Sequence, residues 1–288
     1  MNRALGFFYV LMAGLGFGFL GIFGRLAFQS GMSVGELLTW RFSLAALILW
    51  VGLLIFQPRL IRLSLKQILI SCALGIGGYA VFSTLYFKSI EGISVPLAAL
   101  LLFTFPIFVN LGAHFILKHR MTKLQSLSLL LTCLGLGILL WGPMVVHSKK
   151  AVFFGLGAAF VYSIYVLVSG QVQQKVAPLS SSLYVITSTA LALFLFHQPS
   201  LSKIPNMSTV QMTCILGLAI FSTIGPLTFF LAGLQRLPSS QASIIVTVEP
   251  VVATFAAGLI LNERLTSFQM LGAGIIITAL ILNATEKK

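Results

Sequence analysis

Long apolar runs separated by short polar segments occupy almost the whole chain. A helix needs about 20 predominantly apolar residues to cross the hydrocarbon core of a bilayer. The chain contains ten such runs when it is cut at prolines, glycines and charge clusters. They cover roughly residues 5–27, 34–56, 67–87, 94–117, 124–146, 151–171, 179–197, 209–234, 239–261 and 266–284. The pattern predicts an all-α integral membrane protein with ten transmembrane helices, the first of which is too long for a signal peptide.

The two halves of the chain repeat each other at an offset of 144 residues. Ile116–Thr122 is matched by Ile260–Thr266, and Pro106 is matched by Pro250. Each copy contains five predicted spans, and a unit with an odd number of spans must insert its second copy upside down. Inverted repeats of this kind are typical of transporters. We therefore expect two inverted five-helix repeats, residues 1–146 and 147–288.

Composition places the protein in lipid and excludes several functional classes. Hydrophobic residues make up 58% of the chain and charged residues 8%, against about 25% charged residues in soluble domains. The net charge of +13 does not predict a nucleic-acid partner, because the 18 Lys and Arg residues lie in short clusters between apolar runs. Eleven of them lie on the side of the predicted topology that holds both termini, and six on the other. The positive-inside rule then predicts a multi-pass protein of the inner membrane with both termini in the cytoplasm.

Motifs for catalysis, metals or cofactors are missing from the sequence. There is no aspartate, no GxSxG, no HExxH and no phosphate-binding GxxxxGK[ST]. The glycines of Gly16–Gly21 spell GxGxxG, but they lie inside an apolar run without a preceding strand, which favours close helix packing. The cysteines are scattered in separate apolar runs, at Cys72, Cys133 and Cys214. We expect no enzyme, no bound metal and no cofactor.

Glu249 is the most informative single residue, because it falls near the middle of the ninth span. A carboxylate at the bilayer centre costs about 2.5–3.5 kcal/mol on insertion scales and usually faces a cavity or a partner. Two functions fit it, binding of an amine or other cation and proton uptake. A structural hydrogen bond between helices fits it equally well.

Three prolines within spans predict helix breaks, namely Pro106, Pro250 and Pro226. Such breaks shape a substrate site or a hinge in some membrane proteins and serve packing alone in others. Either role fits these three residues.

Tyr79, Tyr162 and Tyr165 are aromatic residues with polar tips inside spans three and six, and Tyr162 and Tyr165 share a helix face. They fit a cavity for an amphipathic solute, and they also fit ordinary packing or interfacial aromatics. Asn110 on the fourth span is a weaker candidate for the same cavity. Arg41, near the start of the second span, is interpreted as an interfacial anchor rather than as a pore residue.

The end of the chain resembles the last two spans of EamA-type carriers of the drug/metabolite transporter superfamily. The resemblance rests on Ser243–Thr254, which contains Glu249-Pro250, and on Leu259–Thr266, which contains Glu263-Arg264-Leu265. A fainter copy lies in the first half around Pro106, although His119 stands where such carriers often have a glutamate. The resemblance implies two inverted five-helix repeats around a central cavity, and export or exchange of small organic solutes such as amino acids.

The leading hypothesis is therefore a carrier that moves small organic metabolites, amino acids or related compounds first among them, across the bilayer by alternating access, in the direction of export. Uptake or exchange of a nucleoside-like metabolite or a cofactor is the alternative within this class. A membrane enzyme, a channel and a non-transporting membrane protein are the alternatives outside it. Proton coupling through Glu249, facilitated diffusion and exchange all fit the sequence, and the oligomeric state is open.

Overall fold

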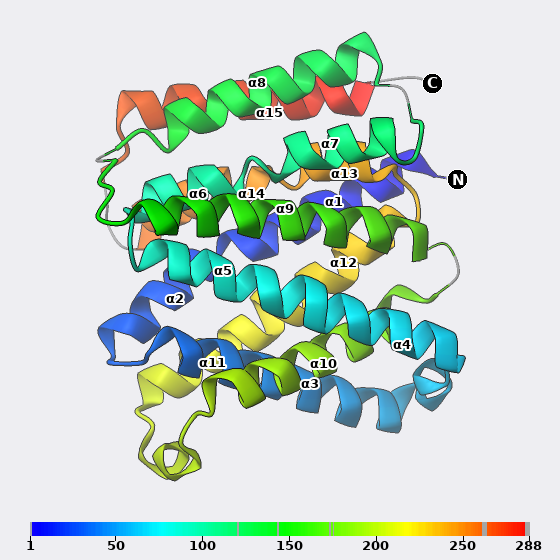
Figure 1. The fold of residues 1–288 in the computed structure, drawn as a ribbon, viewed down its shortest axis with the longest axis vertical. Helices are drawn as coiled ribbons and strands as arrows, with labels where there is room; N and C mark the ends of the chain where they lie inside the picture. Colours follow the sequence, from blue (N-terminus) through cyan, green and yellow to red (C-terminus); the bar gives the residue numbers. More distant parts are fainter. Residues whose placement is uncertain are drawn as a thin grey trace.

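The computed structural model describes residues 2–119, 121–142, 144–172, 174, 176–260 and 264–285, and every named element in these ranges is a helix (Figure 1). Within these ranges, nine helical segments are long and apolar enough to cross a membrane, and α8 is a tenth apolar helix of 17 residues. The prediction of an all-helical membrane protein with ten apolar helices is confirmed.

The first half contains five helical segments, of which three are interrupted. They are α1 (Arg3–Gly18) with α2 (Leu20–Gln29), α3 (Val34–Phe56), α4 (Leu65–Ala73) with the π-helix η2 (Leu74–Ala80) and α5 (Val81–Ile90), α6 (Val95–Leu102) with α7 (Phe105–Phe115), and α8 (Lys123–Leu139). A short 3₁₀ helix, η1 (Pro58–Ile61), connects α3 to α4.

The second half follows the same plan, except that its first segment, α9, is continuous. Its segments are α9 (Lys149–Val172), α10 (Pro178–His197), α11 (Thr209–Ala219) with the π-helix η5 (Ile220–Ile224) and α12 (Gly225–Leu234), α13 (Ser239–Ile245) with α14 (Val248–Ile260), and α15 (Ser267–Thr285). The 3₁₀ helix η4 (Leu201–Asn206) lies between α10 and α11.

One predicted boundary is wrong. The fifth span was expected to reach residue 146, but α8 ends at Leu139. Glycine and proline follow in Gly142-Pro143 and disfavour further helix. The chain beyond them pairs with the connection between α5 and α6, where the Ser94 backbone N–H donates to the Val145 carbonyl at 3.0 Å.

The same local devices recur at repeat-related positions. Capping boxes, in which a Ser or Thr side chain and a Gln side chain three residues later satisfy each other's backbone N–H, begin four helices. They pair at the 144-residue offset as Ser64/Gln67 with Ser208/Gln211 and Thr122/Gln125 with Thr266/Gln269. The π-helical turns η2 and η5 are also repeat mates.

The fourth segment of each half breaks just before its proline. The chain turns at Phe103–Thr104 ahead of Pro106 and at Val246–Thr247 ahead of Pro250. At each turn a threonine hydroxyl donates to the carbonyl three residues earlier, at 2.6 Å. The chain thus turns ahead of both prolines at which the sequence predicts a break, and a hinge or substrate-site role for Pro106 and Pro250 stays a prediction.

Helices from the two halves interleave. Helix α8 packs along α15, and α3 packs along α10. The contact of α1 with α12 has a repeat mate in the contact of α9 with α5. Glycines in α1 allow the approach to the second half, since a Cβ on Gly18 would lie 2.6 Å from the Val252 side chain. Gly16 and Gly18 of the GxGxxG stretch thus serve close helix packing, whereas a Cβ on Gly21 would meet nothing within 4 Å.

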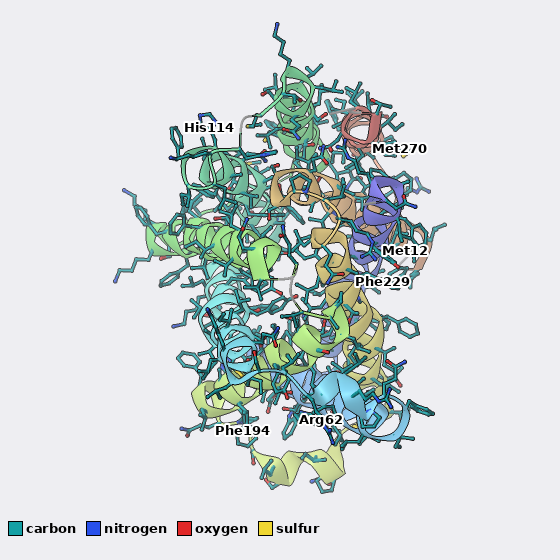
Figure 2. The ribbon with its side chains drawn as sticks, turned by 90° about the vertical axis from the view of Figure 1, so that its right-hand side faces the viewer. Met12, Arg62, His114, Phe194, Phe229 and Met270 are labelled. Atoms are coloured by element: carbon teal, nitrogen blue, oxygen red, sulfur yellow. The ribbon has the colours of Figure 1, made fainter. Side chains whose placement is uncertain are left out.

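The helices run roughly parallel, so the bundle has two opposite ends (Figure 1). We call the end where α1 begins and α15 ends the terminal face. The opposite face carries the connections 30–33, 91–94, 140–148, 198–208 and 264–266, of which residue 143 lies outside the described ranges. The start of α1 and the end of α15 thus lie on one side of the bundle, as an even number of spans requires. Figure 2 looks onto the terminal face, where the helices are seen nearly end-on.

Candidate binding cavity

A cavity of about 360 Å³ lies between the two halves. It begins at mid-depth, at Tyr79, Phe105 and Glu249, and reaches the exposed residue Arg264 on the face opposite the termini. Ligand-binding pockets in proteins typically enclose about 300–1,000 Å³. The cavity therefore has room for a small molecule.

Four aromatic rings form the deep wall of this cavity. The Tyr162 ring lies with its centroid 4.7 Å from the centroids of Phe82 and Phe105, and Tyr79 lies 4.8 Å from Phe82. The rings of Tyr79, Phe82, Phe105 and Tyr162 all line the space. Their edge-to-face and tilted contacts fix the rings in place and leave a rigid, largely apolar surface.

Tyr165 lies behind this wall. Its ring stacks on Tyr162 at 6.0 Å and meets Tyr79 edge-on at 5.4 Å, but the residue is 1% exposed and does not line the cavity. Gly78 in the π-helix η2 makes room for it, since a Cβ there would lie 2.9 Å from the Tyr165 ring. Tyr165 therefore supports the two tyrosines that face the cavity.

Glu249 occupies the first turn of α14, directly after the helix break. Its neighbours Val248 and Pro250 are buried, whereas Glu249 is partly exposed and lines the cavity. Among the described residues, its carboxylate has no hydrogen-bond or ion-pair partner within 4.0 Å. The positive end of the α14 dipole stabilises a negative charge at this position. The structure thus places the acid at the floor of the cavity, next to a helix N-terminus.

Arg41 also lines the cavity, and its interpretation as an interfacial anchor is wrong. The residue is 4% exposed, and its guanidinium carbon lies 4.6 Å from the centroid of the Phe42 ring. The spacing along α3 explains the burial, because Leu37, Arg41 and Ala45 follow at intervals of four on one buried face. That spacing is visible in the sequence and could have identified Arg41.

Two further predicted residues lie away from the cavity. Asn110 is 1% exposed, and its side-chain amide donates to the Pro106 carbonyl at 2.7 Å. Pro226 lines a separate apolar groove together with Met12 and Phe229, which lie together at the edge of the bundle in Figure 2. His114, a neighbour of Asn110 on α7, points outward at the periphery in the same view.

Thr254 was missed by sequence reasoning, although its repeat mate Asn110 was considered. The Thr254 hydroxyl donates to the Pro250 carbonyl at 2.8 Å, as the Asn110 amide does to Pro106. Thr254 lines the cavity and Asn110 does not. Both halves thus have a side-chain hydrogen bond to the proline carbonyl four residues earlier, and only in the second half does its donor residue line the cavity.

The cavity ends against tightly packed helices toward the terminal face. All seven residues of α13 are buried there. The Ser239 hydroxyl donates to the Val166 carbonyl at 3.3 Å, and Arg3 donates to the Gln241 side-chain oxygen at 3.0 Å. Contacts among α1, α9 and α13 therefore close this end of the bundle.

Comparison with known proteins agrees with this architecture. Residues 4–141 and 149–285 each match the EamA-like transporter family. The uncharacterized transporter YcbK of Bacillus subtilis is 25% identical over 286 residues, which cover 95% of this chain and 90% of that protein. The threonine/homoserine exporter RhtA of Escherichia coli is 26% identical over 243 residues, covering 83% and 78%. A solved crystal structure shares the fold with a TM-score of 0.82 at 16% identity, over 98% of this chain and 96% of that one.

Proposed function

Because the chain belongs to the EamA-like transporter family, we propose that the cavity between its halves is the site from which it exports small organic metabolites. The chain is a multi-pass membrane protein, and transport is the function of its family. The proposal adds the site, the substrate class and the direction. The observation that carries it is the position of the cavity at the junction of two inverted repeats, open at one end and closed at the other.

Amino acids and related compounds are the substrate class that we propose. The relative RhtA is named an exporter of threonine and homoserine. The lining combines rigid aromatic rings with a carboxylate and a guanidinium, and such a mixed surface suits a small solute that has both an apolar body and charged groups.

Alternating access is the proposed mechanism. The repeat units proposed above, residues 1–146 and 147–288, would rock against each other and open the cavity to each face in turn, with Pro106 and Pro250 at the flexing points. The charge distribution supports placing the terminal face in the cytoplasm, in which case the structure is open to the outside.

Transport by the purified full chain in proteoliposomes tests the proposal. We expect saturable counterflow of labelled threonine or another amino acid, and a loss of at least tenfold in Glu249→Gln and Tyr162→Ala. Matched controls are Glu91→Gln, an exposed carboxyl outside the cavity, and Phe153→Ala, a ring on α9 that is 73% exposed.

Two results would count against the proposal in different ways. Full transport in both cavity variants would remove the site assignment and leave the carrier function intact. Flux that rises linearly with concentration and shows no counterflow would instead indicate a channel.

A further inference from the structure

We propose that Arg41 and Glu249 bind the two ends of a zwitterionic substrate, with the Arg41 guanidinium on its carboxylate and the Glu249 carboxylate on its ammonium group. This inference rests on the proposed carrier function, and it assigns a specificity role to Arg41.

The two charges at the deep end of the cavity are opposite in sign but do not pair. Arg41 and Glu249 both line the cavity, yet no ion pair within 4.0 Å joins them in the described part of the chain. The third charged lining residue, Arg264, is exposed at the mouth. The deep end therefore presents one separated pair of opposite charges.

A buried guanidinium without a carboxylate partner is energetically unfavourable, because the protein has removed its water without replacing the hydrogen bonds. Arg41 is 4% exposed, and its Nε has no hydrogen-bond partner among the described residues. The guanidinium carbon lies 4.6 Å from the centroid of the Phe42 ring, a distance at which the ring face attracts the cation. A planar guanidinium with a free N–H donor is the preferred partner for a carboxylate, which it binds through two parallel hydrogen bonds.

Glu249 completes the site from the other half. Its carboxylate faces the same cavity from the first turn of α14, whereas Arg41 extends from α3. An ammonium group is the natural donor to such a carboxylate. A simple amine would satisfy Glu249 and leave Arg41 without a partner, and a simple anion would do the reverse. Only a molecule with both charges matches the pair.

A ligand held in this way joins the two halves of the protein. One end of it contacts the first repeat and the other end contacts the second. Binding energy then depends on the relative position of the repeats, which is what a carrier needs to couple substrate binding to rocking. The aromatic wall of Tyr79, Phe82, Phe105 and Tyr162 lines the same cavity as these two residues and suits an apolar side chain.

Matched ligands test the inference on the purified full chain. We would measure dissociation constants calorimetrically for phenylalanine, for phenethylamine, which lacks the carboxylate, and for 3-phenylpropionate, which lacks the amine. Leucine, 3-methylbutylamine and 4-methylpentanoate form a second set with a smaller body. Wild-type protein should bind at least one of the two amino acids tenfold or more tighter than both of its analogues.

The variants then assign each end of the ligand. Arg41→Gln should weaken binding of the amino acid at least tenfold and leave the amine unaffected, and Glu249→Gln should weaken the amino acid and leave the acid analogue unaffected. Arg41→Lys keeps the positive charge but loses the planar guanidinium. Its affinity for the amino acid should lie between those of the wild type and Arg41→Gln. Arg59→Gln, an exposed arginine on the terminal face, is the control.

Three outcomes would overturn the inference: an analogue that binds as tightly as its amino acid, no binding of any ligand, or an equal loss for all three ligands in Arg41→Gln. The comparison of ligands on the wild-type protein needs no variant, so the inference can still be contradicted if Arg41→Gln misfolds. Counterflow separates this inference from the carrier proposal. Counterflow without tighter binding of the amino acid than of its analogues would contradict only the zwitterion assignment. Tighter binding of the amino acid without counterflow would contradict only the transport proposal.

Discussion

Helices α6 and α13 occupy equivalent positions in the two repeats but have different surroundings. Every residue of α13 is buried, whereas Ala98 is the only buried residue of α6. Val95 at the start of α6 is 58% exposed at the cavity, while its repeat mate Ser239 is 7% exposed and bonded to α9. Helix α13 thus closes its end of the bundle, whereas α6 leaves the other end open.

The sequences of these two helices match their surroundings. Helix α13 carries Ser239, Ser240, Gln241 and Ser243, small or hydrogen-bonding residues that suit close helix contact in lipid. Helix α6 is apolar throughout. The difference shows that an inverted repeat need not be chemically symmetric: a closed end can be held by polar contacts, and an open end can present an apolar surface to a cavity.

The largest expected effect comes from locking α6 in the closed position. Gly170 packs against Ser239 at the terminal face, and the repeat mates of these residues are Leu26 and Val95. A disulfide needs Cα atoms about 4.4–6.8 Å apart. In a chain without its native cysteines, Leu26→Cys with Val95→Cys should therefore cross-link only when α6 closes on α2. Oxidation should then reduce transport more than 100-fold, and a reducing agent should restore it.

The single variant Val95→Cys, treated with the same oxidant, controls for damage unrelated to the cross-link. If the cross-link forms and transport continues unchanged, α6 does not act as the counterpart of α13.

A smaller effect is expected from disturbing the closed end. Gly170→Leu places leucine at 170, as in the repeat mate Leu26. The new side chain would collide with Ser239. Overpacking of this kind costs about 1–3 kcal/mol, which should lower the melting temperature by several degrees. Ser240→Cys in the same background, buried at 1% exposure in the native protein, should become reactive to an impermeant maleimide in inside-out vesicles.

Gly274→Leu is the matched control, because a Cβ at Gly274 would meet nothing within 4 Å. Equal destabilisation by both substitutions would show that the contact of α13 with α9 is no more sensitive to an added side chain than an open helix surface.

The smallest expected effect is the difference in stability lost when each side-chain hydrogen bond to a proline carbonyl is removed. Asn110→Leu removes a buried donor from the Pro106 carbonyl and should cost about 1 kcal/mol. Thr254→Val removes the equivalent donor from Pro250 beside the cavity, where water can replace it, and should cost about half of that or less. Thermal unfolding of both variants compares them directly. A larger loss for Thr254→Val would contradict this view of the two halves.

Much of the fold follows from local sequence. Span lengths, the 144-residue repeat and the breaks before Pro106 and Pro250 depend on apolar run length and proline chemistry, and both act over a few residues. The end of α8 was misjudged because Gly142-Pro143 lies within an apolar run, where hydropathy alone gives no stop.

The cavity was only partly predictable, because it depends on which helix face meets which neighbour. Glu249, Tyr79 and Tyr162 stood out by their chemistry, and all three line it. Tyr165 shares a helix face with Tyr162, yet stacking behind that ring removes it from the cavity. Arg41 was misassigned because closeness to a span end was weighed above the periodic burial of Leu37 and Ala45. Which of these residues bind a substrate stays a prediction.

The paired capping boxes have a consequence for how such a protein arises. The caps at Ser64/Gln67 and Ser208/Gln211 lie at opposite ends of the bundle, and so do those at Thr122/Gln125 and Thr266/Gln269. A neutral cap of this kind satisfies backbone N–H groups at any aqueous boundary, whereas a lysine or arginine favours one side of a membrane. Helix starts encoded by caps are therefore indifferent to orientation. A duplicated gene segment can keep them unchanged in both copies, while loop charges alone diverge to fix which copy is inverted.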